Sequence, residues 1–158
     1  VASGLYEDQV DKIDWCAQHI GRVTHSLFHS SGPHRTALVA TELGVIAGVD
    51  LRQSTLAWRQ VLPTDEKVVD LQQSGKVLVS LGVAPAGLFI RLWSTLGSLV
   101  WDHLVPGPSD SSTPIVQFVG KMIVVAWKSD VIAFDGTNGA QVWCVQLIDK
   151  KYLCRLAR

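Results

Sequence analysis

Three histidines, His25, His29 and His34, lie within ten residues in the stretch "THSLFHSSGPH". Imidazole is a common ligand of zinc and other transition metals, so such a group could hold a metal ion. The spacing places the three side chains alternately in strand and loop, and no nearby Cys or carboxylate completes a ligand set. We therefore expect exposed or partly buried loop histidines and no metal site; His19 and His103 have no partner in the sequence.

Three aspartates, Asp14, Asp50 and Asp135, are candidates for acid catalysis. Asp50 and Asp135 each stand eight residues before a tryptophan, so they occupy equivalent places in two repeats. Catalysis needs unlike residues that converge on one point, whereas repeats place like residues at separate points. The sequence predicts that these carboxylates cap turns.

The three cysteines, Cys16, Cys144 and Cys154, form no C-x-x-C pair, which disfavours a zinc or redox site and favours three buried thiols. No G-x-S-x-G motif is present, and "QQSGKV" (72–77) lacks the first glycine of a phosphate-binding loop. We interpret 72–77 as a hairpin turn. The sequence thus predicts no catalytic, cofactor-binding or metal-binding residue, and no enzyme activity.

The tryptophans are more informative than these candidates. Trp15, Trp58, Trp101 and Trp143 recur at a spacing of about 42 residues, which is typical of propeller blades and of helical arrays. The local pattern favours blades, because the chain between the tryptophans consists of short segments rich in Val, Ile, Leu and Trp. These expected strands span 36–41, 44–50, 56–62, 76–81, 88–93, 99–104, 115–120, 121–127, 130–135 and 141–147.

Each tryptophan follows a turn. In "DGTNG" (135–139), Asp135 can accept backbone N–H bonds and Gly139 can adopt the left-handed conformation; Gly97 stands at the equivalent place. We expect the indole that follows to pack in the seam between neighbouring sheets. Ser54 and Trp93 depart from the pattern, and "GVAPAG" (82–87) predicts a lengthened inner loop.

The repeats predict an all-β fold, a partial β-propeller of about three four-stranded antiparallel blades plus one strand of another. Residues 1–22 would contain the outer strand of an incomplete blade, 23–147 three consecutive blades, and 148–158 an atypical tail. Closed propellers have at least four blades, so we expect the start of a larger propeller. "VASG" (1–4) has the small-residue character of a signal-peptide end.

Composition excludes several classes. Hydrophobic residues make up 47% of the 158 residues, and Lys plus Arg equals Asp plus Glu at 14 each. The balance of charge disfavours nucleic-acid binding, and no window of about 18 apolar residues is free of charge, so no membrane span is expected in this segment.

The pattern Asp-x-x-x-Gly-x-x-x-Trp, clearest in "AFDGTNGAQVW" (133–143), resembles the quinoprotein-type propeller repeat. The N-terminal "LYEDQVDKIDW" (5–15), with "IGRV" (20–23), "LVATELGVIAGVD" (38–50) and "LAWRQV" (56–61), is similar to the start of the ER membrane protein complex subunit 1 family. The resemblance covers residues 5–147 and ends there.

That resemblance implies a lumenal scaffold, part of a single-pass protein of the ER membrane, whose complex inserts transmembrane segments, including tail-anchored proteins. The implied partners are the other subunits of the complex, with no cofactor and no small-molecule substrate. Two alternatives stay open: a fragment of a quinone (PQQ)-dependent dehydrogenase and a WD-type peptide-binding propeller. The first lacks a Cys-Cys pair, and the second finds its Trp-Asp dipeptide only at 101–102.

Overall fold

A computed structural model of the chain describes residues 20–63, 65–108 and 112–147. Within these ranges the chain forms twelve strands in three four-stranded antiparallel sheets, each built from four consecutive strands. We call them blade 1 (β1–β4), blade 2 (β5–β8) and blade 3 (β9–β12). The strands are β1 (Val23–Ser31), β2 (His34–Thr41), β3 (Val45–Asp50), β4 (Thr55–Val61), β5 (Lys67–Ser74), β6 (Val77–Ala84), β7 (Gly87–Ser94), β8 (Leu99–Pro106), β9 (Ile115–Val119), β10 (Met122–Trp127), β11 (Asp130–Asp135) and β12 (Gln141–Gln146).

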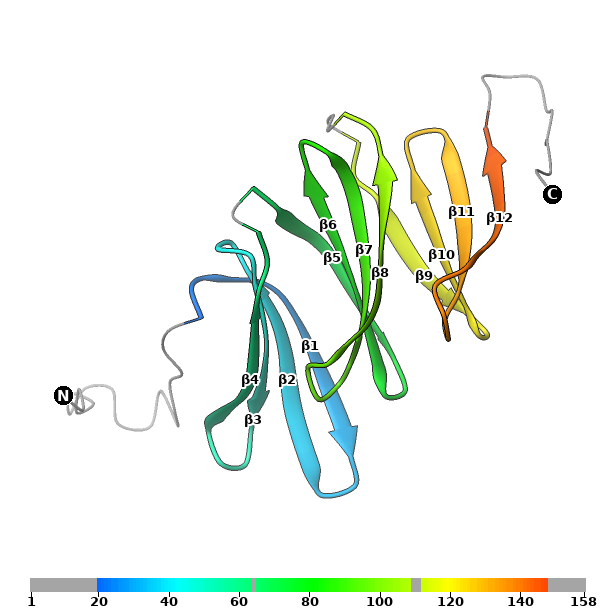
Figure 1. The fold of residues 1–158 in the computed structure, drawn as a ribbon. Helices are drawn as coiled ribbons and strands as arrows, with labels where there is room; N and C mark the ends of the chain where they lie inside the picture. Colours follow the sequence, from blue (N-terminus) through cyan, green and yellow to red (C-terminus); the bar gives the residue numbers. More distant parts are fainter. Residues whose placement is uncertain (1–19, 64, 109–111, 148–158) are drawn as a thin grey trace.

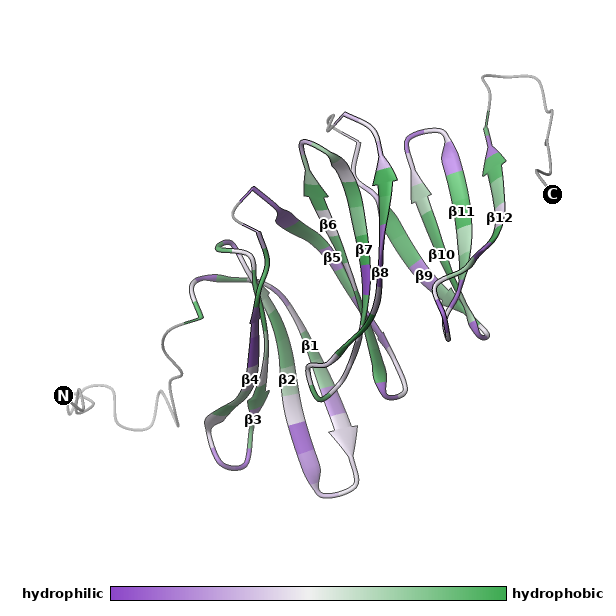
Figure 2. Ribbon diagram, in the orientation of Figure 1, coloured by the Kyte–Doolittle hydropathy of each residue, from purple (hydrophilic) through white to green (hydrophobic). Residues whose placement is uncertain are grey.

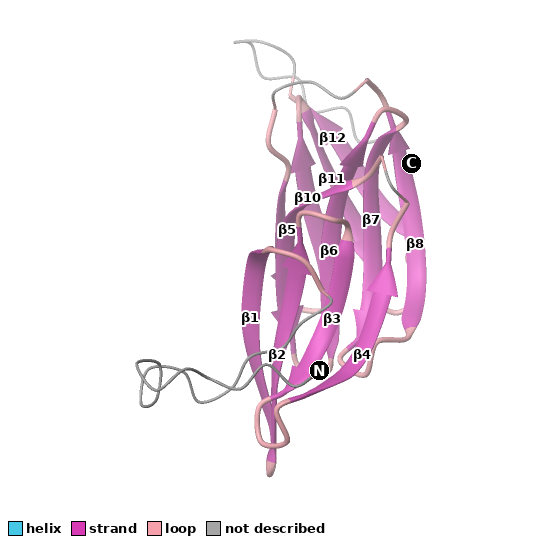
Figure 3. Cartoon of the chain, turned by 90° about the vertical axis from the view of Figure 1, so that its left-hand side faces the viewer, coloured by secondary structure: helices cyan, strands magenta, loops and turns pink. Residues whose placement is uncertain are grey.

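The blades stand side by side in chain order and form an open arc (Figure 1). Their first strands are neighbours, since β1 contacts β5 and β5 contacts β9. The first strand of each blade is therefore the inner strand, and the fourth, β4, β8 or β12, is the outer one. Figure 3, viewed from the blade 1 side, shows the sheets stacked one behind another. The predicted partial β-propeller is confirmed.

Each blade has two faces. We call the face toward the next blade in the chain the trailing face and the opposite one the leading face. Leu38 and Ile46 on the trailing face of blade 1 pack with Leu71, Leu78 and Trp93 on the leading face of blade 2. The larger cluster between blades 2 and 3 has the same layout and includes Leu81, Ile90, Trp101, Ile123 and Phe134. Hydrophobic burial between sheets thus joins the blades.

The leading face of blade 1 carries a third cluster. Ala37 and Val39 of β2 and Val45, Ala47 and Val49 of β3 are buried there together with Ile20. Because alternate residues of a strand point to opposite faces, this cluster and the one around Leu38 lie on opposite sides of the same sheet. Ile20 brings the chain that enters β1 onto the leading face.

A β-bulge recurs at one place in every blade. The register between the third and fourth strands shifts at Gly48/Val49, Leu92/Trp93 and Ala133/Phe134, next to Trp58, Trp101 and Trp143 respectively. Bulges increase the local twist and redirect a side chain. Here the repeated bulge lies beside the tryptophan that leaves the sheet toward the next blade.

The sequence pattern located ten of these strands to within a few residues of their ends and missed β1 and β5. Two expectations differ in detail. Ala84 pairs with Gly87, so 82–87 is not a lengthened loop but two longer strands joined by a tight turn. The turn in 72–77 is confirmed, because Ser74 pairs with Val77 around Gly75.

Several predictions fall on residues that the structure does not describe. The closing strand expected within residues 1–22 lies mostly in 1–19, and the atypical tail is 148–158; Asp14, Trp15, Cys16, His19 and Cys154 also lie outside the described residues. Across the described ranges, no helix is long and apolar enough to cross a membrane.

Candidate functional site: the interblade seams

Trp58 of β4 makes the seam between blades 1 and 2. Its indole N–H donates a hydrogen bond to the Thr95 carbonyl oxygen at 3.0 Å, and the Gln60 side-chain amide donates to the Gly97 carbonyl oxygen at 3.0 Å. A Cβ placed on Gly97 would lie 2.5 Å from Cδ2 of Trp58, and Gly97 has a φ of 89°. The indole therefore lies directly on the backbone of the next blade's β7–β8 turn, where only glycine fits.

Trp101 of β8 repeats this contact one blade further on. Its side chain is buried, its indole N–H points to the Gly136 carbonyl oxygen at 3.5 Å, and a Cβ on Gly139 would lie 2.7 Å from its Cδ2. The Trp101 and Phe134 ring centroids are 6.1 Å apart. The prediction that the regularly spaced indoles pack between blades is confirmed for these two tryptophans.

Asp50 and Asp135 cap turns between the third and fourth strands of blades 1 and 3, as predicted. The Asp50 carboxylate accepts hydrogen bonds from the backbone N–H groups of Arg52 (2.8 Å) and Gln53 (3.0 Å), and that of Asp135 accepts from Thr137 (2.7 Å). These backbone bonds are the main reason that the pKa of each aspartate lies below its usual value. The carboxylates stabilise turns.

Blade 2 lacks the turn aspartate, because Trp93 stands there. The Trp93 side chain is buried instead, and its indole N–H donates to the Ser80 hydroxyl oxygen at 2.9 Å. The neighbouring Ser94 takes over the cap, since its hydroxyl oxygen accepts from the Ser98 backbone N–H at 3.1 Å. This exchange explains how the repeat tolerates the substitution.

The trailing face of blade 3 is only partly covered among the described residues, since Ala133 on it is fully buried but several of its apolar side chains are exposed. Trp143 is half-buried there, and Ile115 and Val119 of the inner strand are 63% and 49% exposed. Val124 of β10 lies on the same face, because it pairs with Ala133, which in turn pairs with Trp143. It is half-buried. The corresponding faces of blades 1 and 2 are covered by the next blade. The apolar trailing face of blade 3 is therefore built like the trailing faces of blades 1 and 2, which pack against the next blade.

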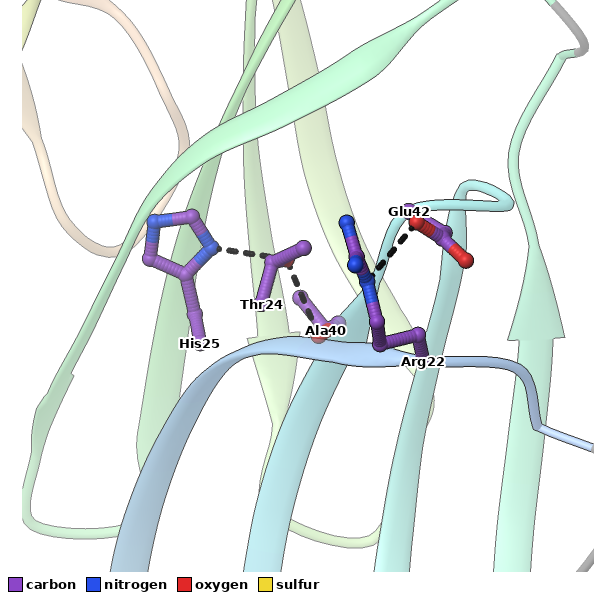
Figure 4. A network of polar contacts seen from close by, with 5 residues as sticks. All are labelled: Arg22, Thr24, His25, Ala40 and Glu42. Carbon is purple, nitrogen blue, oxygen red and sulfur yellow. Dashed lines mark hydrogen bonds and ion pairs between the residues drawn. The ribbon is translucent and has the colours of Figure 1, made fainter.

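The three clustered histidines do not form a metal site. His25 and His29 are half-buried on the inner strand β1, not in loops as the sequence suggested, and His34 begins β2. His25 contacts the Thr24 hydroxyl, which donates to the Ala40 carbonyl oxygen, beside the Arg22–Glu42 ion pair (Figure 4). Over residues 20–63, 65–108 and 112–147, no three His, Cys, Asp or Glu side chains could together hold a metal ion.

Two histidines, one from this cluster and one from blade 2, link blades. His29 hydrogen-bonds the Gln73 side chain of β5, which joins the inner strands of blades 1 and 2. His103, which has no partner in the sequence, packs on Phe134 of blade 3 with ring centroids 4.9 Å apart. Both contacts are structural.

A buried ion pair was not foreseen. Glu66, in the connection from blade 1 to blade 2, is 3% exposed and pairs with Arg91 of β7, which is 7% exposed. The second carboxylate oxygen, Oε2, has no hydrogen-bond partner, and the Arg91 guanidinium lies over the Phe89 ring, 4.7 Å from its centroid. A Cβ on Gly82 would overlap the Glu66 carboxylate. The pair anchors the connection inside blade 2, and breaking it would leave a buried charge.

Cys144 is a free thiol and is half-buried, not buried as expected. It packs against the cluster between blades 2 and 3. Burial, followed by the charge of Asp130, raises the pKa of this thiol, which makes it a weak nucleophile at neutral pH.

The chain matches the model of the EMC1 N-terminal β-propeller domain over residues 4–154. The chain belongs to this family. It is 29% identical over 152 residues to the ER membrane protein complex subunit 1 of Gallus gallus and 29% identical over 156 residues to that of Xenopus laevis. Each match covers 93% of this EMC1-family chain and 15% of the relative, so the chain spans about 15% of the length of these curated relatives.

Solved structures show the same fold. The EMC1-family chain is similar to BamB from Moraxella catarrhalis, with a TM-score of 0.53 and 21% identity over 69% of this chain and 33% of that one. The Pan2 WD40 domain of Neurospora crassa gives a TM-score of 0.61 and 16% identity, with 82% and 40% covered. At these identities the likeness supports a propeller architecture alone.

Proposed function

We propose that this chain is a scaffold module, the first blades of a lumenal propeller in the ER membrane protein complex. The proposal rests on one observation, the EMC1 family match over residues 4–154. Its partners would be the other subunits of the complex, and its contribution to the insertion of transmembrane segments, tail-anchored proteins included, would be to hold those subunits in place. This role needs no catalytic group and no cofactor.

The geometry supports a structural role. The sequence analysis considered aspartates, histidines and a cysteine as candidates for catalysis or metal binding. In the described structure, these side chains cap turns, link blades or pack in seams. The trailing face of blade 3 around Trp143 is an apolar sheet face that the described residues cover only in part. Exposed apolar surface of this kind marks a site of association.

We further propose the domain layout that the repeats imply. Residues 1–22 supply the outer strand of an incomplete blade, and 23–147 form three blades. The trailing face of blade 3 receives a further blade of the same propeller, and 148–158 lie outside the repeat.

Affinity purification tests the scaffold role. The protein, tagged and extracted from ER membranes in mild detergent, should recover the other subunits of the complex. Trp143→Asp should reduce that recovery, because the charge would stand on the face where we place the next blade. Gln146→Asp is a matched control, since Gln146 is exposed and lies two residues from Cys144, on the other face of β12. Recovery of none of these subunits by the unaltered protein would refute the role.

The lumenal placement has a separate test. Asn138 and Ala140 are both exposed in the β11–β12 turn, and Ala140→Ser creates an Asn-Gly-Ser glycosylation acceptor at positions 138–140. In the lumen this variant should gain a glycan that an endoglycosidase removes, whereas Ala140→Val should not. A folded Ala140→Ser variant that stays unglycosylated in cells would contradict the placement.

A further inference from the structure

A small basic hollow lies between two turns of blade 1. It has a volume of about 290 Å³ and is lined by Gly32 and Pro33 of the β1–β2 turn, Arg35 of β2 and Arg52 of the β3–β4 turn. The Leu51 backbone N–H donates to the Arg35 carbonyl oxygen at 2.9 Å. The Arg52 guanidinium donates to the Pro33 carbonyl oxygen at 3.4 Å. Both turns lie at the lower end of blade 1 in Figure 1, and the start of β2 there is purple in Figure 2.

The two guanidinium groups are available to an anion. Arg35 and Arg52 are exposed, and the ion pairs among the described residues join Arg22 to Glu42 and Arg91 to Glu66, not these two arginines to a carboxylate. The nearby Asp50 uses its carboxylate oxygen Oδ1 to accept from the backbone N–H groups of Arg52 and Gln53. Planar guanidinium groups bind carboxylates in a bidentate manner, so the hollow fits an acidic side chain.

Arg35 stands where the other blades have an interblade contact. It lies on the leading face of blade 1, because it is two residues from Ala37 and four from Val39 on the same strand. The equivalent first inward residues of β6 and β10 are Leu78 and Ile123, which are fully buried against the preceding blade. Whatever covers the leading face of blade 1 therefore meets a cation where the other seams have an aliphatic side chain.

The β3–β4 turn departs from the repeat in the same way. Six residues before the outer-strand tryptophan stands Arg52 in blade 1 but Thr95 or Thr137 in the other blades. Four residues before it stands Ser54, with a φ of 56°, in place of Gly97 or Gly139. Because an indole lies on both of those glycines, the Cβ of Ser54 excludes the same close contact. Arg59, exposed on β4 opposite Ala47, adds a further cation to this face.

The chain itself carries a matching segment. Residues 7–14, "EDQVDKID", contain four carboxylates and one lysine. Ile20 is buried on the leading face, and a Cβ on Gly21 would lie 3.5 Å from the Thr41 hydroxyl oxygen at the far end of β2. From Thr41 to Arg35 the strand covers about 20 Å, and the six residues from Ile20 back to Asp14 can span about 20 Å. The acidic segment can therefore reach the hollow.

We propose that the acidic N-terminal segment, residues 7–14, docks on the leading face of blade 1 with its carboxylates on Arg35 and Arg52. The first seam of the arc then combines the apolar cluster around Val39 with ionic contacts at Arg35 and Arg52, whereas the next two seams are closed by an indole on a glycine. The proposal concerns contacts within the chain, so it does not depend on any partner subunit.

Proteolysis at Lys12, inside the acidic segment, tests this docking. A lysine-specific protease should cut the chain after Lys12 more slowly than it cuts a free peptide of residues 1–22. Arg35→Leu with Arg52→Thr, which restores the residue types of the other blades, should accelerate this cleavage about tenfold, as should high salt. The matched control is Lys76→Glu, a charge reversal in the exposed β5–β6 turn of blade 2, and it should leave the rate unchanged.

A charge exchange separates docking from general unfolding. Arg35→Asp should accelerate cleavage, and adding Asp11→Arg and Asp14→Arg should restore the slow rate, with peptides of the same sequence as reference. Asp11→Asn with Asp14→Asn leaves the blades unaltered and should by itself accelerate the cut. If Lys12 is cleaved at the peptide rate in the unaltered chain, or at one rate in all variants, the segment does not occupy the hollow and the proposal fails.

Discussion

Gly97 offers the sharpest test of the seam. Gly97→Ala adds one methyl group at a residue whose φ is 89°, and that group would lie 2.5 Å from Cδ2 of Trp58. The left-handed backbone alone costs an alanine about 1–2 kcal/mol. The overlap with the indole must be relieved by displacing the ring or the turn, and overpacking of this kind costs about 1–3 kcal/mol more. We therefore expect a loss of about 2–5 kcal/mol in the free energy of unfolding.

Gly75→Ala is the matched control. Gly75 also has a positive φ, 58°, in a hairpin turn, but a Cβ there meets nothing within 4 Å. It should cost only the backbone share, about 1–2 kcal/mol. Urea unfolding followed by tryptophan fluorescence gives both values, provided that the slope with urea stays the same.

The double variant Trp58→Ala with Gly97→Ala tests whether the added methyl group and the indole interact. Once the indole is removed, the added methyl group has nothing to displace, so the double variant should lose less stability than the sum of the two single variants. If Gly97→Ala is no more destabilising than Gly75→Ala, or if the two changes are additive, the indole does not pack on this turn in solution.

Three further outcomes follow from the same geometry. Ser54→Gly should raise the free energy of unfolding by about 1 kcal/mol, because it relieves a left-handed serine; a loss in urea midpoint would contradict this. Trp101→Ala should lower the free energy of unfolding by about 3–5 kcal/mol, as for a buried indole, and clearly more than Trp143→Ala, because Trp143 is only half-buried. Equal losses in urea unfolding would contradict this difference in burial. Asp135→Ala should destabilise the chain near neutral pH but little in strong acid. The pKa of Asp135 is lowered on folding, so its contribution is present above the unfolded value of 3.8 and is lost as pH falls through the folded value. Unfolding curves across pH check this, and a gap that does not narrow in acid would refute it.

The architecture was predictable because its signals repeat. A period set by Trp58, Trp101 and Trp143 and short β-branched segments between them identify blades without any tertiary information. The structure shows that Gly97 and Gly139 each stand almost one repeat length after the tryptophan that lies on them. The spacing of the tryptophans does not determine toward which face of the sheet each indole points.

The inner strands β1 and β5 were missed for a physical reason. An inner strand near the centre of the arc is less enclosed than the middle strands, and β1 accordingly has no buried residue. Its sequence, rich in Ser, His and Thr, therefore carries little hydrophobic signal. His25 and His29 were assigned to loops on that account.

The Glu66–Arg91 pair was missed for another reason. Glu66 stands in a polar connection and Arg91 interrupts an apolar strand, with β5 and β6 between them in the sequence. Each side chain is costly to bury alone and tolerable only with the other. No local pattern marks such a pair, because the partners meet only after the strands of blade 2 have assembled.

Because each indole contacts the blade that follows it in the chain, the order of synthesis matters for folding. Trp58 and Trp101 contact turns that lie almost a full blade further along the chain. During synthesis, the apolar trailing face of each blade therefore stays exposed to solvent until the next blade has been made. Chains grow from the N-terminus at about 5–20 residues per second, which leaves each bare side uncovered for seconds. The blades would therefore assemble in order from the N-terminus. A ribosome that stalls between two blades would leave a Trp-bearing face exposed to chaperones.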